Sequence, residues 1–344
     1  MIDLQLDADE EMIRDTARAF AQERLVPAMR VHERQGGVGV ELVRAYRALG
    51  FAGMGAPATA GGQDASPLAK ALVLEELGAG DAGAAFALEG AGPALQALVE
   101  LGETTLLRRV LDHPDLRIGF VSDGEGRLTL DSRTVTGTHP WSPVPASGCA
   151  AVVVVQGERM ALVRDGVALA RVAPCGLAAA GACQLDFTGA PVVAMTSDRD
   201  AVARAKAHAR RFAAALLVGL ARVATEYAMR YAQDRVAFGR PIAHHQGLAF
   251  LLADMATAVE GARLALWRAA AGRDDDGGAR AAAWAFAEAA EQALFVGPSA
   301  VQVLGGHGFM KDHPVEKWMR DIRTLALLDG GRDAAELEAA AAEI

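Results

Sequence analysis

The chain has 344 residues, and 52% of them are apolar while only 5% are aromatic. Hydrophobicity carried mainly by Ala, Leu and Val favours close-packed helices and argues against an all-β sandwich. The 43 acidic residues outnumber the 34 basic ones, for a net charge of −9, which argues against a protein that binds nucleic acid through a basic face. At this length we expect two domains, or three layers that share a core.

Two features of the sequence concern its location. The longest uninterrupted apolar run, residues 212–221, is bracketed by arginines and is shorter than the roughly 18 residues that a membrane span requires. The acidic N-terminus lacks the apolar segment of a signal peptide. We therefore expect a cytoplasmic protein without a transmembrane helix.

The first third of the chain is predicted to be helical. Residues 8–34 carry apolar side chains at helical spacing, with Pro27 as a break or kink. A second helix is expected at about 40–49. A third begins at Ser66-Pro67, because Ser is a favourable N-cap and Pro fits the first turn of a helix. We expect an N-terminal helical domain at 1–115.

The pattern changes at about residue 116 to β-branched runs separated by Gly, Asp and Pro, which is typical of strands and turns. We expect a middle β domain at 116–197. Its three cysteines, Cys149, Cys175 and Cys183, are not spaced for a disulfide framework or a zinc site and are predicted to be small buried hydrophobes. The histidines show no paired metal-ligand spacing, so no metal is expected.

Helical spacing returns after Ser197. Residues 212–227 and 248–266 carry apolar stripes, which predict two long helices joined at 238–241, and an Ala-rich helix follows up to Gly297-Pro298. We expect a C-terminal helical bundle at 198–344 whose apolar stripes supply oligomer contacts. Without alternating strands and helices, a Rossmann fold is disfavoured.

Two segments of the bundle carry motifs. The first is Arg235-Val-Ala-Phe-Gly-Arg-Pro-Ile242 with Gln246, and the second is Gln302-Val-Leu-Gly-Gly-His-Gly-Phe309, followed by Pro314-Val-Glu-Lys-Trp-Met-Arg-Asp321. Each alone is explained by Gly and Pro at helix ends. Together they resemble the acyl-CoA dehydrogenase family, with its R-x-x-F-G-x-P-I-x-x-x-Q and Q-x-x-G-G-x-G-(F/Y) motifs. Further anchors lie in family order: Phe20, Pro27, Leu49-Gly50, Pro57 with Gly61-Gly62, and Glu75-Glu76-Leu77.

This resemblance implies a fold that is mostly α with a middle β domain: a helical N-terminal domain, a β-barrel or sandwich, and a C-terminal four-helix bundle. It also implies non-covalent FAD, an acyl-CoA thioester as substrate, electron-transfer flavoprotein or a similar acceptor, and a dimer or tetramer. The shortened chain is similar to the small subunits of heteromeric acyl-CoA dehydrogenases that act on bulky side chains such as those of steroids.

The resemblance assigns cofactor residues in the bundle. Arg235 is expected to reach the FAD pyrophosphate of a neighbouring subunit, which suits the bidentate, permanently charged guanidinium. Phe238 and Gln246 would line the same FAD. Gln302 and the Gly305-Gly306 turn would let backbone approach the cofactor, because glycine has no side chain to obstruct it.

Further residues are assigned by the resemblance outside these motifs. Val121-Ser122 takes the place of a pair that hydrogen-bonds the flavin edge, and Trp141-Ser142 takes the place of a flavin-facing pair, although a Trp packed in a β core is a competing interpretation. Arg210 falls at a buried arginine beside the acyl-CoA site. Its neighbour Arg211 could equally be that arginine, or a solvated partner.

The catalytic base is the main departure from the family. Where the family has Glu-Gly-Thr, this chain has Asp329-Gly330-Gly331, and the alternative base position before the buried arginine is Ala209. We therefore expect Asp329 to take the α-proton of the thioester while the β-hydrogen leaves as hydride to flavin N5. The alternatives are a catalytically weak or silent partner subunit of a heteromeric acyl-CoA dehydrogenase, or a dehydrogenase that acts on acyl groups linked to a carrier protein.

Overall fold

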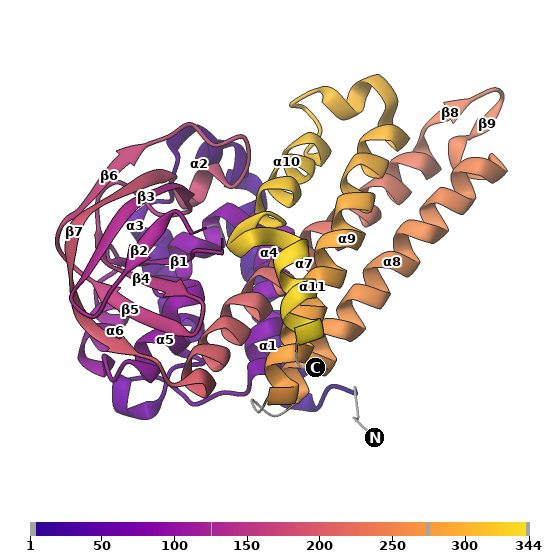
Figure 1. The fold of residues 1–344 in the computed structure, drawn as a ribbon. Coiled ribbons are helices and arrows are strands. Elements are labelled where there is room, and N and C mark those ends of the chain that lie inside the picture. The colour runs from indigo at the N-terminus through magenta and orange to yellow at the C-terminus, as the bar shows by residue number, and fades with distance from the viewer. Residues whose placement is uncertain (1–4, 125, 273–275, 342–344) are drawn as a thin grey trace.

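The computed structural model describes residues 5–124, 126–272 and 276–341. A β-sheet lies at one side of the molecule, and long helices lie at the other (Figure 1). Helix α7 links the two parts, and α4 packs beside it. The expected fold class, mostly α with β structure in the middle and helices on either side, is confirmed. The division into domains at 115/116 and 197/198 stays a proposal.

Capping residues and a proline set the boundaries of several N-terminal helices. Asp7 and Glu10 form a capping box at the start of α1, and Ser66 caps α4 through the Ala69 amide. The expected kink at Pro27 is confirmed as a short π turn and a 3-10 turn that separate α1 from α2. The helices of this part are α1 (Ala8–Phe20), α2 (Met29–Gln35), α3 (Val40–Ala48), α4 (Pro67–Glu89), α5 (Leu95–Glu100) and α6 (Thr104–Asp112).

The middle of the chain forms one mixed sheet. Its strand order is β1-β4-β5-β7-β3-β2, with β6 paired to β7. The long strand β7 pairs with both β5 and β3, so it joins the two halves of the sheet. The strands are β1 (Arg117–Ser122), β2 (Leu128–Leu130), β3 (Thr134–Ser142), β4 (Cys149–Gln156), β5 (Arg159–Val163), β6 (Val167–Arg171) and β7 (Cys183–Thr196).

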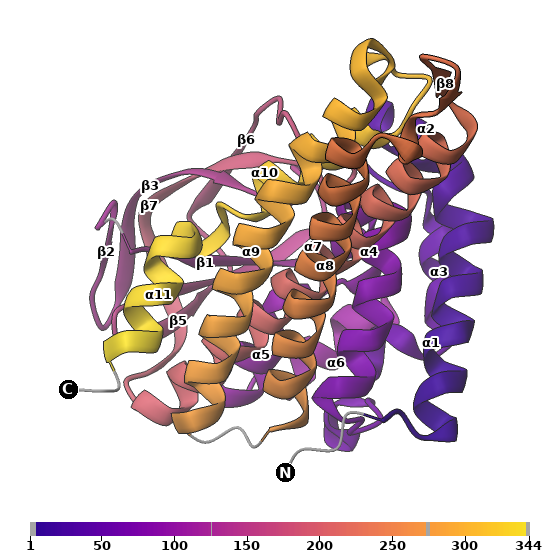
Figure 2. The same ribbon diagram turned by 90° about the vertical axis from the view of Figure 1, so that its right-hand side faces the viewer.

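The C-terminal part is a bundle of long helices that run side by side (Figure 2). The hairpin of β8 (Val236–Ala237) and β9 (Arg240–Pro241) projects from one end of the bundle, which we call the bundle tip (Figure 1). The helices are α7 (Arg199–Asp234), α8 (Gln246–Ala271), α9 (Asp276–Leu304), α10 (Val315–Leu325) and α11 (Gly331–Ala341).

One helix boundary differs from the sequence prediction. Helix α9 does not end at Gly297-Pro298 but continues through both residues to Leu304. The reason is packing: a Cβ on Gly297 would lie 3.2 Å from the Ile322 side chain and 3.4 Å from Met319. Gly297 therefore marks the close approach of α10 to α9, not a helix end.

Helix α7 forms the centre of the core. It crosses α4 at very short distance, because a Cβ on Gly78 would lie 2.5 Å from the Leu216 carbonyl oxygen and one on Gly219 would lie 2.0 Å from that of Glu75. By length and composition, α7 is the one described helix apolar enough to cross a membrane, which the apolar-run argument missed. Since 72% of its most apolar window is buried in the protein, packing in the core accounts for this composition.

The cysteines are only partly as predicted. All three are free, and Cys183 is buried while Cys149 is partly buried. Cys175 is exposed, contrary to the prediction, because it lies in the loop after β6, outside the apolar strands.

Candidate active site

A cavity of about 190 Å³ lies between the ends of β1 and β3 and the turn that joins α10 to α11. Asp329 lines it from the turn, Ser122 from β1, and Trp141 and Ser142 from β3. These four residues come from three separate segments of the sequence and were all predicted site residues. We call this space the Asp329 cavity.

The turn that carries Asp329 has an unusual backbone. Asp329, Gly330 and Gly331 all have positive φ, of 54°, 81° and 67°. An aspartate tolerates the left-handed region, but the φ of 67° and ψ of −158° at Gly331 suit glycine alone. A threonine at 331 would therefore be strained in this turn, so Gly331 is matched to the backbone that presents Asp329.

The carboxyl group of Asp329 is electrostatically perturbed. Burial raises its pKa from 3.8 to about 6; Arg210, Lys206 and the Ser122 amide oppose this rise, while Glu338 adds to it. Desolvation thus outweighs the nearby cations. A carboxyl group with a pKa near 6 is mostly ionised at neutral pH and is a stronger base than an exposed aspartate.

Arg210 faces the turn from α7. It is only 3% exposed, and it donates to the Asp329 carbonyl oxygen at 2.9 Å and to that of Gly331 at 3.5 Å. Its guanidinium also lies over the Phe286 ring, 4.7 Å from the centroid. Arg211 is likewise buried, so the solvated role considered for it is wrong.

The β-sheet side of the cavity supplies polar groups. Ser142 is 1% exposed, and its hydroxyl has no hydrogen-bond partner among the described residues. A buried hydroxyl of this kind is costly unless something else satisfies it. Trp141 is half-buried and lines the cavity, so it is not simply part of a β core. Val121, which was predicted as a cofactor residue, is buried in the sheet core and does not line the cavity.

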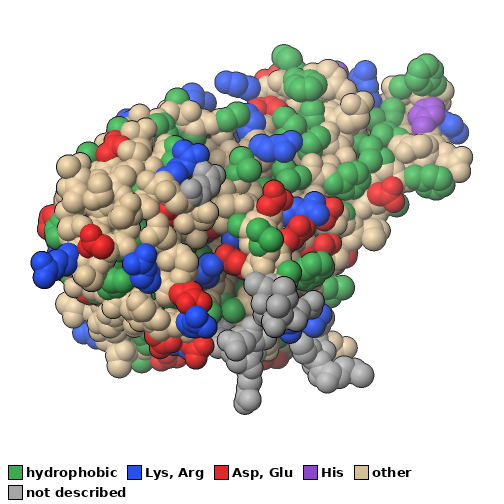
Figure 3. Space-filling view, viewed as in Figure 1, with side chains coloured by type: hydrophobic (Ala, Val, Ile, Leu, Met, Phe, Trp, Pro, Cys, Tyr) green, Lys and Arg blue, Asp and Glu red, His purple; other side chains and the backbone are tan. Residues whose placement is uncertain are grey.

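The other predicted cofactor residues lie elsewhere, around the bundle tip. Phe238 is 95% exposed with a φ of 53°, a conformation that is strained for a bulky residue. Figure 3 shows apolar side chains gathered at this end of the bundle. The predicted cofactor residues at this end are all exposed: Arg235, Phe238, Gln246, Gln302, Gly305 and Gly306. None of these six residues lines the described Asp329 cavity.

The paired glycines of the tip have different surroundings. Gly305 has a φ of 58°, so its backbone conformation favours glycine. Neither a Cβ at 305 nor one at 306 would meet any described atom within 4 Å. Gly308 differs, since its Cβ would lie 2.4 Å from the Val301 carbonyl oxygen. Gly308 thus serves the packing of this chain, whereas Gly305 and Gly306 leave backbone open to the outside.

Sequence reasoning missed three residues around Arg210. Phe286 lies under its guanidinium, and Glu338 of α11 lies 3.7 Å from it and 2.5 Å from Lys206. The i, i+4 spacing of Lys206 and Arg210 predicts that they share a face of α7. No signal in the sequence joins that face to Glu338 or Phe286, because these contacts are tertiary.

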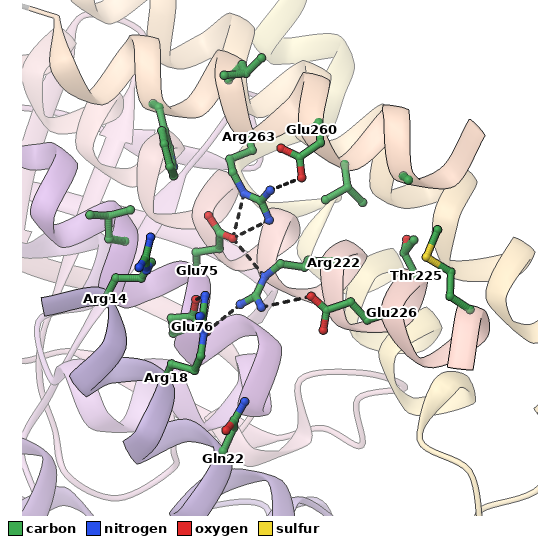
Figure 4. A pocket seen from close by; sticks show the side chains of 16 residues that line it. Arg14, Arg18, Gln22, Glu75, Glu76, Arg222, Thr225, Glu226, Glu260 and Arg263 are labelled. Carbon is green, nitrogen blue, oxygen red and sulfur yellow. Dashed lines mark hydrogen bonds and ion pairs between the residues drawn. The ribbon is translucent and has the colours of Figure 1, made fainter. Parts of the chain in front are cut away.

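A larger cavity, of about 580 Å³, lies between α1, α4, α7 and α8 (Figure 4). Its charges neutralise one another: Arg222 contacts Glu75 at 3.1 Å and Glu76 at 2.7 Å, while Arg263 also reaches Glu75 and Arg18 reaches Glu76. It contains no predicted site residue. We therefore take the Asp329 cavity as the candidate active site.

Comparison with known proteins shows the family to which this chain belongs. Models of the N-terminal and C-terminal domains of acyl-CoA dehydrogenase match residues 7–113 and 200–343. The chain is 48% identical to cyclohex-1-ene-1-carbonyl-CoA dehydrogenase of Geobacter metallireducens over 124 residues, which is 35% of this chain but only 32% of that protein. It is 28% identical to acryloyl-CoA reductase (NADH) of Anaerotignum propionicum over 96% of this chain and 93% of that one.

Solved structures extend the likeness to the whole fold. Butyryl-CoA dehydrogenase from Megasphaera elsdenii superposes with a TM-score of 0.85, at 22% identity, over 99% of this chain and 100% of that one. Glutaryl-CoA dehydrogenase from Mycobacterium smegmatis gives a TM-score of 0.84 at 23% identity, over 98% and 95% of the two chains. At this identity, the likeness speaks for the fold alone.

Proposed function

Because this chain belongs to the acyl-CoA dehydrogenase family, a family of flavoprotein oxidoreductases, we propose that it introduces a Cα–Cβ double bond into an acyl-CoA thioester. The observation that carries the proposal is the position of Asp329. Its carboxyl group lines a cavity beside Ser122, Trp141 and Ser142, and burial raises its pKa to about 6.

The chain's own residues supply the proton transfer. The Asp329 carboxylate takes the proton from Cα, whose bonding electrons become the second bond between Cα and Cβ. Hydrogen leaves Cβ with its electron pair, and FAD, when bound, accepts this hydride. Arg210 donates to the carbonyl oxygens of Asp329 and Gly331, so the base is held at the cavity.

FAD fits the polar groups of the Asp329 cavity. The buried Ser142 hydroxyl lacks a partner among the described residues, and the flavin edge would supply one. Ser122 would hold the same edge, and Trp141 would lie against the ring system. Aromatic and polar groups that converge on one cavity suit a flat heterocycle with hydrogen-bonding edges.

A second chain would complete the cofactor site. The tip residues are exposed and separate from the Asp329 cavity, which fits the expectation that Arg235 reaches the FAD of a neighbouring subunit. The proposed assembly is a dimer or tetramer, either of this chain alone or with a homologue. Electron-transfer flavoprotein or a similar protein would reoxidise the flavin.

The proposal is tested by anaerobic titration of the FAD-loaded protein with a panel of acyl-CoA thioesters and a carrier-protein thioester. We expect at least one acyl-CoA to bleach the flavin absorbance. Asp329→Asn should slow bleaching by about 10²- to 10⁴-fold, the usual contribution of a general base, while FAD stays bound. The exposed Asp333 of α11 provides a control, and Asp333→Asn should bleach at the parent rate.

Other outcomes would favour the alternatives. The chain is a silent partner subunit if two results are found together. None of the thioesters bleaches the flavin of this chain, and Asp329→Asn leaves the activity of a complex with a homologue unchanged. Bleaching by the carrier-protein thioester alone would replace acyl-CoA as the substrate but keep Asp329 as the base.

A further inference from the structure

A series of ion pairs and hydrogen bonds connects helix α11 to the turn that carries Asp329. Glu338 of α11 pairs with Lys206 of α7 at 2.5 Å, and its same oxygen lies 3.7 Å from Arg210, one turn further along α7. Arg210 then donates to the carbonyl oxygens of Asp329 and Gly331. Arg210 of α7 therefore contacts the turn directly, and Glu338 of α11 contacts it through Arg210.

The Arg210 guanidinium, at the centre of this series of contacts, has little conformational freedom. Arg210 is almost fully buried, and the Phe286 ring covers one of its faces. Its charge is permanent, so it needs anionic or carbonyl partners in the interior. Among the described residues, the carboxylate that forms an ion pair with Arg210 is that of Glu338. Removing Glu338 would leave the guanidinium with the carbonyl oxygens, the aromatic ring and the Coulombic attraction of the Asp329 carboxyl group.

We propose that Glu338 is a positioning residue for the base, which acts through Arg210 on the backbone of the Asp329 turn and through its own charge on the Asp329 carboxyl group. This inference rests on the proposed function insofar as it concerns catalysis. Neither Glu338 nor Lys206 lines the Asp329 cavity, so neither is expected to touch the substrate.

The charged groups around Asp329 predict opposite effects for Glu338 and Lys206. Glu338 raises the pKa of Asp329, whereas Lys206 and Arg210 lower it. Asp123 and Arg127 of the loop between β1 and β2, and His139 of β3, line the same cavity. Asp123 is occupied by hydrogen bonds from the Arg127 and Leu128 amides and from Gln156. A substitution on α7 or α11 would leave these three groups in place.

The test measures the pH dependence of flavin bleaching in the FAD-loaded protein. Glu338→Gln should shift the rising limb of the rate to lower pH, and Lys206→Gln should shift it to higher pH, each by about 0.3 to 1 pH unit for partly exposed charges. Glu336→Gln is the matched control, because Glu336 pairs with Arg332 on α11 at 2.6 Å and does not perturb Asp329.

A second measurement does not depend on activity. Since folding raises the pKa of Asp329 from 3.8 to about 6, the folded protein binds a proton that the unfolded chain has released, and its stability falls as pH rises through that window. Glu338→Gln should move the upper end of this fall to lower pH. In an Asp329→Asn background, the same change should no longer produce this shift.

The outcomes separate this inference from the proposed function. Shifts in the same direction for Glu338→Gln and Lys206→Gln, or a shift no larger than that of Glu336→Gln, would overturn the positioning role. If no thioester bleaches the flavin at any pH, the proposed function fails. The unfolding measurement then still supports or overturns the coupling of Glu338 to Asp329.

Discussion

The Asp329 cavity and the bundle tip are built in opposite ways. In the cavity, side chains from three segments converge, Arg210 and Ser142 are almost fully buried, and the base has a shifted pKa. At the tip, Arg235 and Phe238 are exposed to solvent. A Cβ atom added to Gly305 or Gly306 would have no described atom within 4 Å. The groups of the cavity meet within a single chain, whereas we expect the groups of the tip to find their partners on another chain.

The contrast suggests a division of labour. Buried groups in a fixed geometry can set proton chemistry, because desolvation and locked contacts change their basicity. Exposed groups with strained backbone, such as Phe238, contribute only when something binds over them. We therefore expect changes at the tip to alter cofactor affinity, and changes in the cavity to alter the rate and its pH dependence.

The largest expected effect at the tip is that of Arg235→Ala. It would remove a charge-assisted contact to the FAD pyrophosphate, worth about 1.5–3 kcal/mol, and weaken FAD binding by about one to two decades. Fluorescence titration of the apoprotein with FAD measures this affinity. Arg230→Ala, at an exposed position of α7, should leave it unchanged, and equal losses in both variants would remove the distinction between tip and surface.

In the cavity, the rate of flavin bleaching should follow the ionisation of Asp329. With a pKa of about 6, the reactive carboxylate increases roughly tenfold between pH 5 and pH 7 and then levels off. Stopped-flow absorbance under anaerobic conditions gives this profile, whereas FAD affinity should not follow it. A rate that keeps its pH 7 value down to pH 4 would show that a carboxyl group of ordinary basicity, or none, acts as the base.

A smaller effect is expected for Ser142→Ala. The change removes a buried hydroxyl that has no described partner, so the FAD-free protein should be as stable as the parent or slightly more so. FAD binding should weaken about five- to tenfold, since one neutral hydrogen bond is lost. Thermal unfolding with and without FAD compares the two states. A loss of stability in the FAD-free protein would mean that the hydroxyl serves the fold instead.

Much of the fold could be predicted from the sequence because its signals are local. The cap at Ser66, the kink at Pro27 and the apolar stripe of α7 each depend on residues close together in the sequence. The prediction was wrong at Gly297-Pro298, where α9 continues because α10 packs against it. Tertiary packing decided that boundary, and the local sequence could not reveal it.

For the candidate site, the sequence predicted individual residues but not the tertiary contacts between them. The motifs identified Asp329, Trp141 and Ser142, and the structure brings them to one cavity. The contacts of Arg210 with Glu338 and Phe286 were not predictable, because they join segments with no common spacing in the sequence. The positive φ values of the Asp329 turn also explain a feature that the sequence left open, the glycine at 331.

The central claim is that the Asp329 cavity of one chain and the tip of another form one active site. It is tested most directly by co-expressing the Asp329→Asn chain with the Arg235→Ala chain. The assay uses an FAD concentration that fills sites with an intact Arg235 and leaves sites without it empty, so that each variant alone is inactive. If the two residues act in the same site from different chains, each mixed dimer holds one site in which both are intact. With random 1:2:1 assortment, we expect co-expression to restore about a quarter of the parent bleaching activity. If the mixture stays as inactive as the two parents while mixed dimers form, Asp329 and Arg235 do not meet across an interface between copies of this chain, and the account is contradicted.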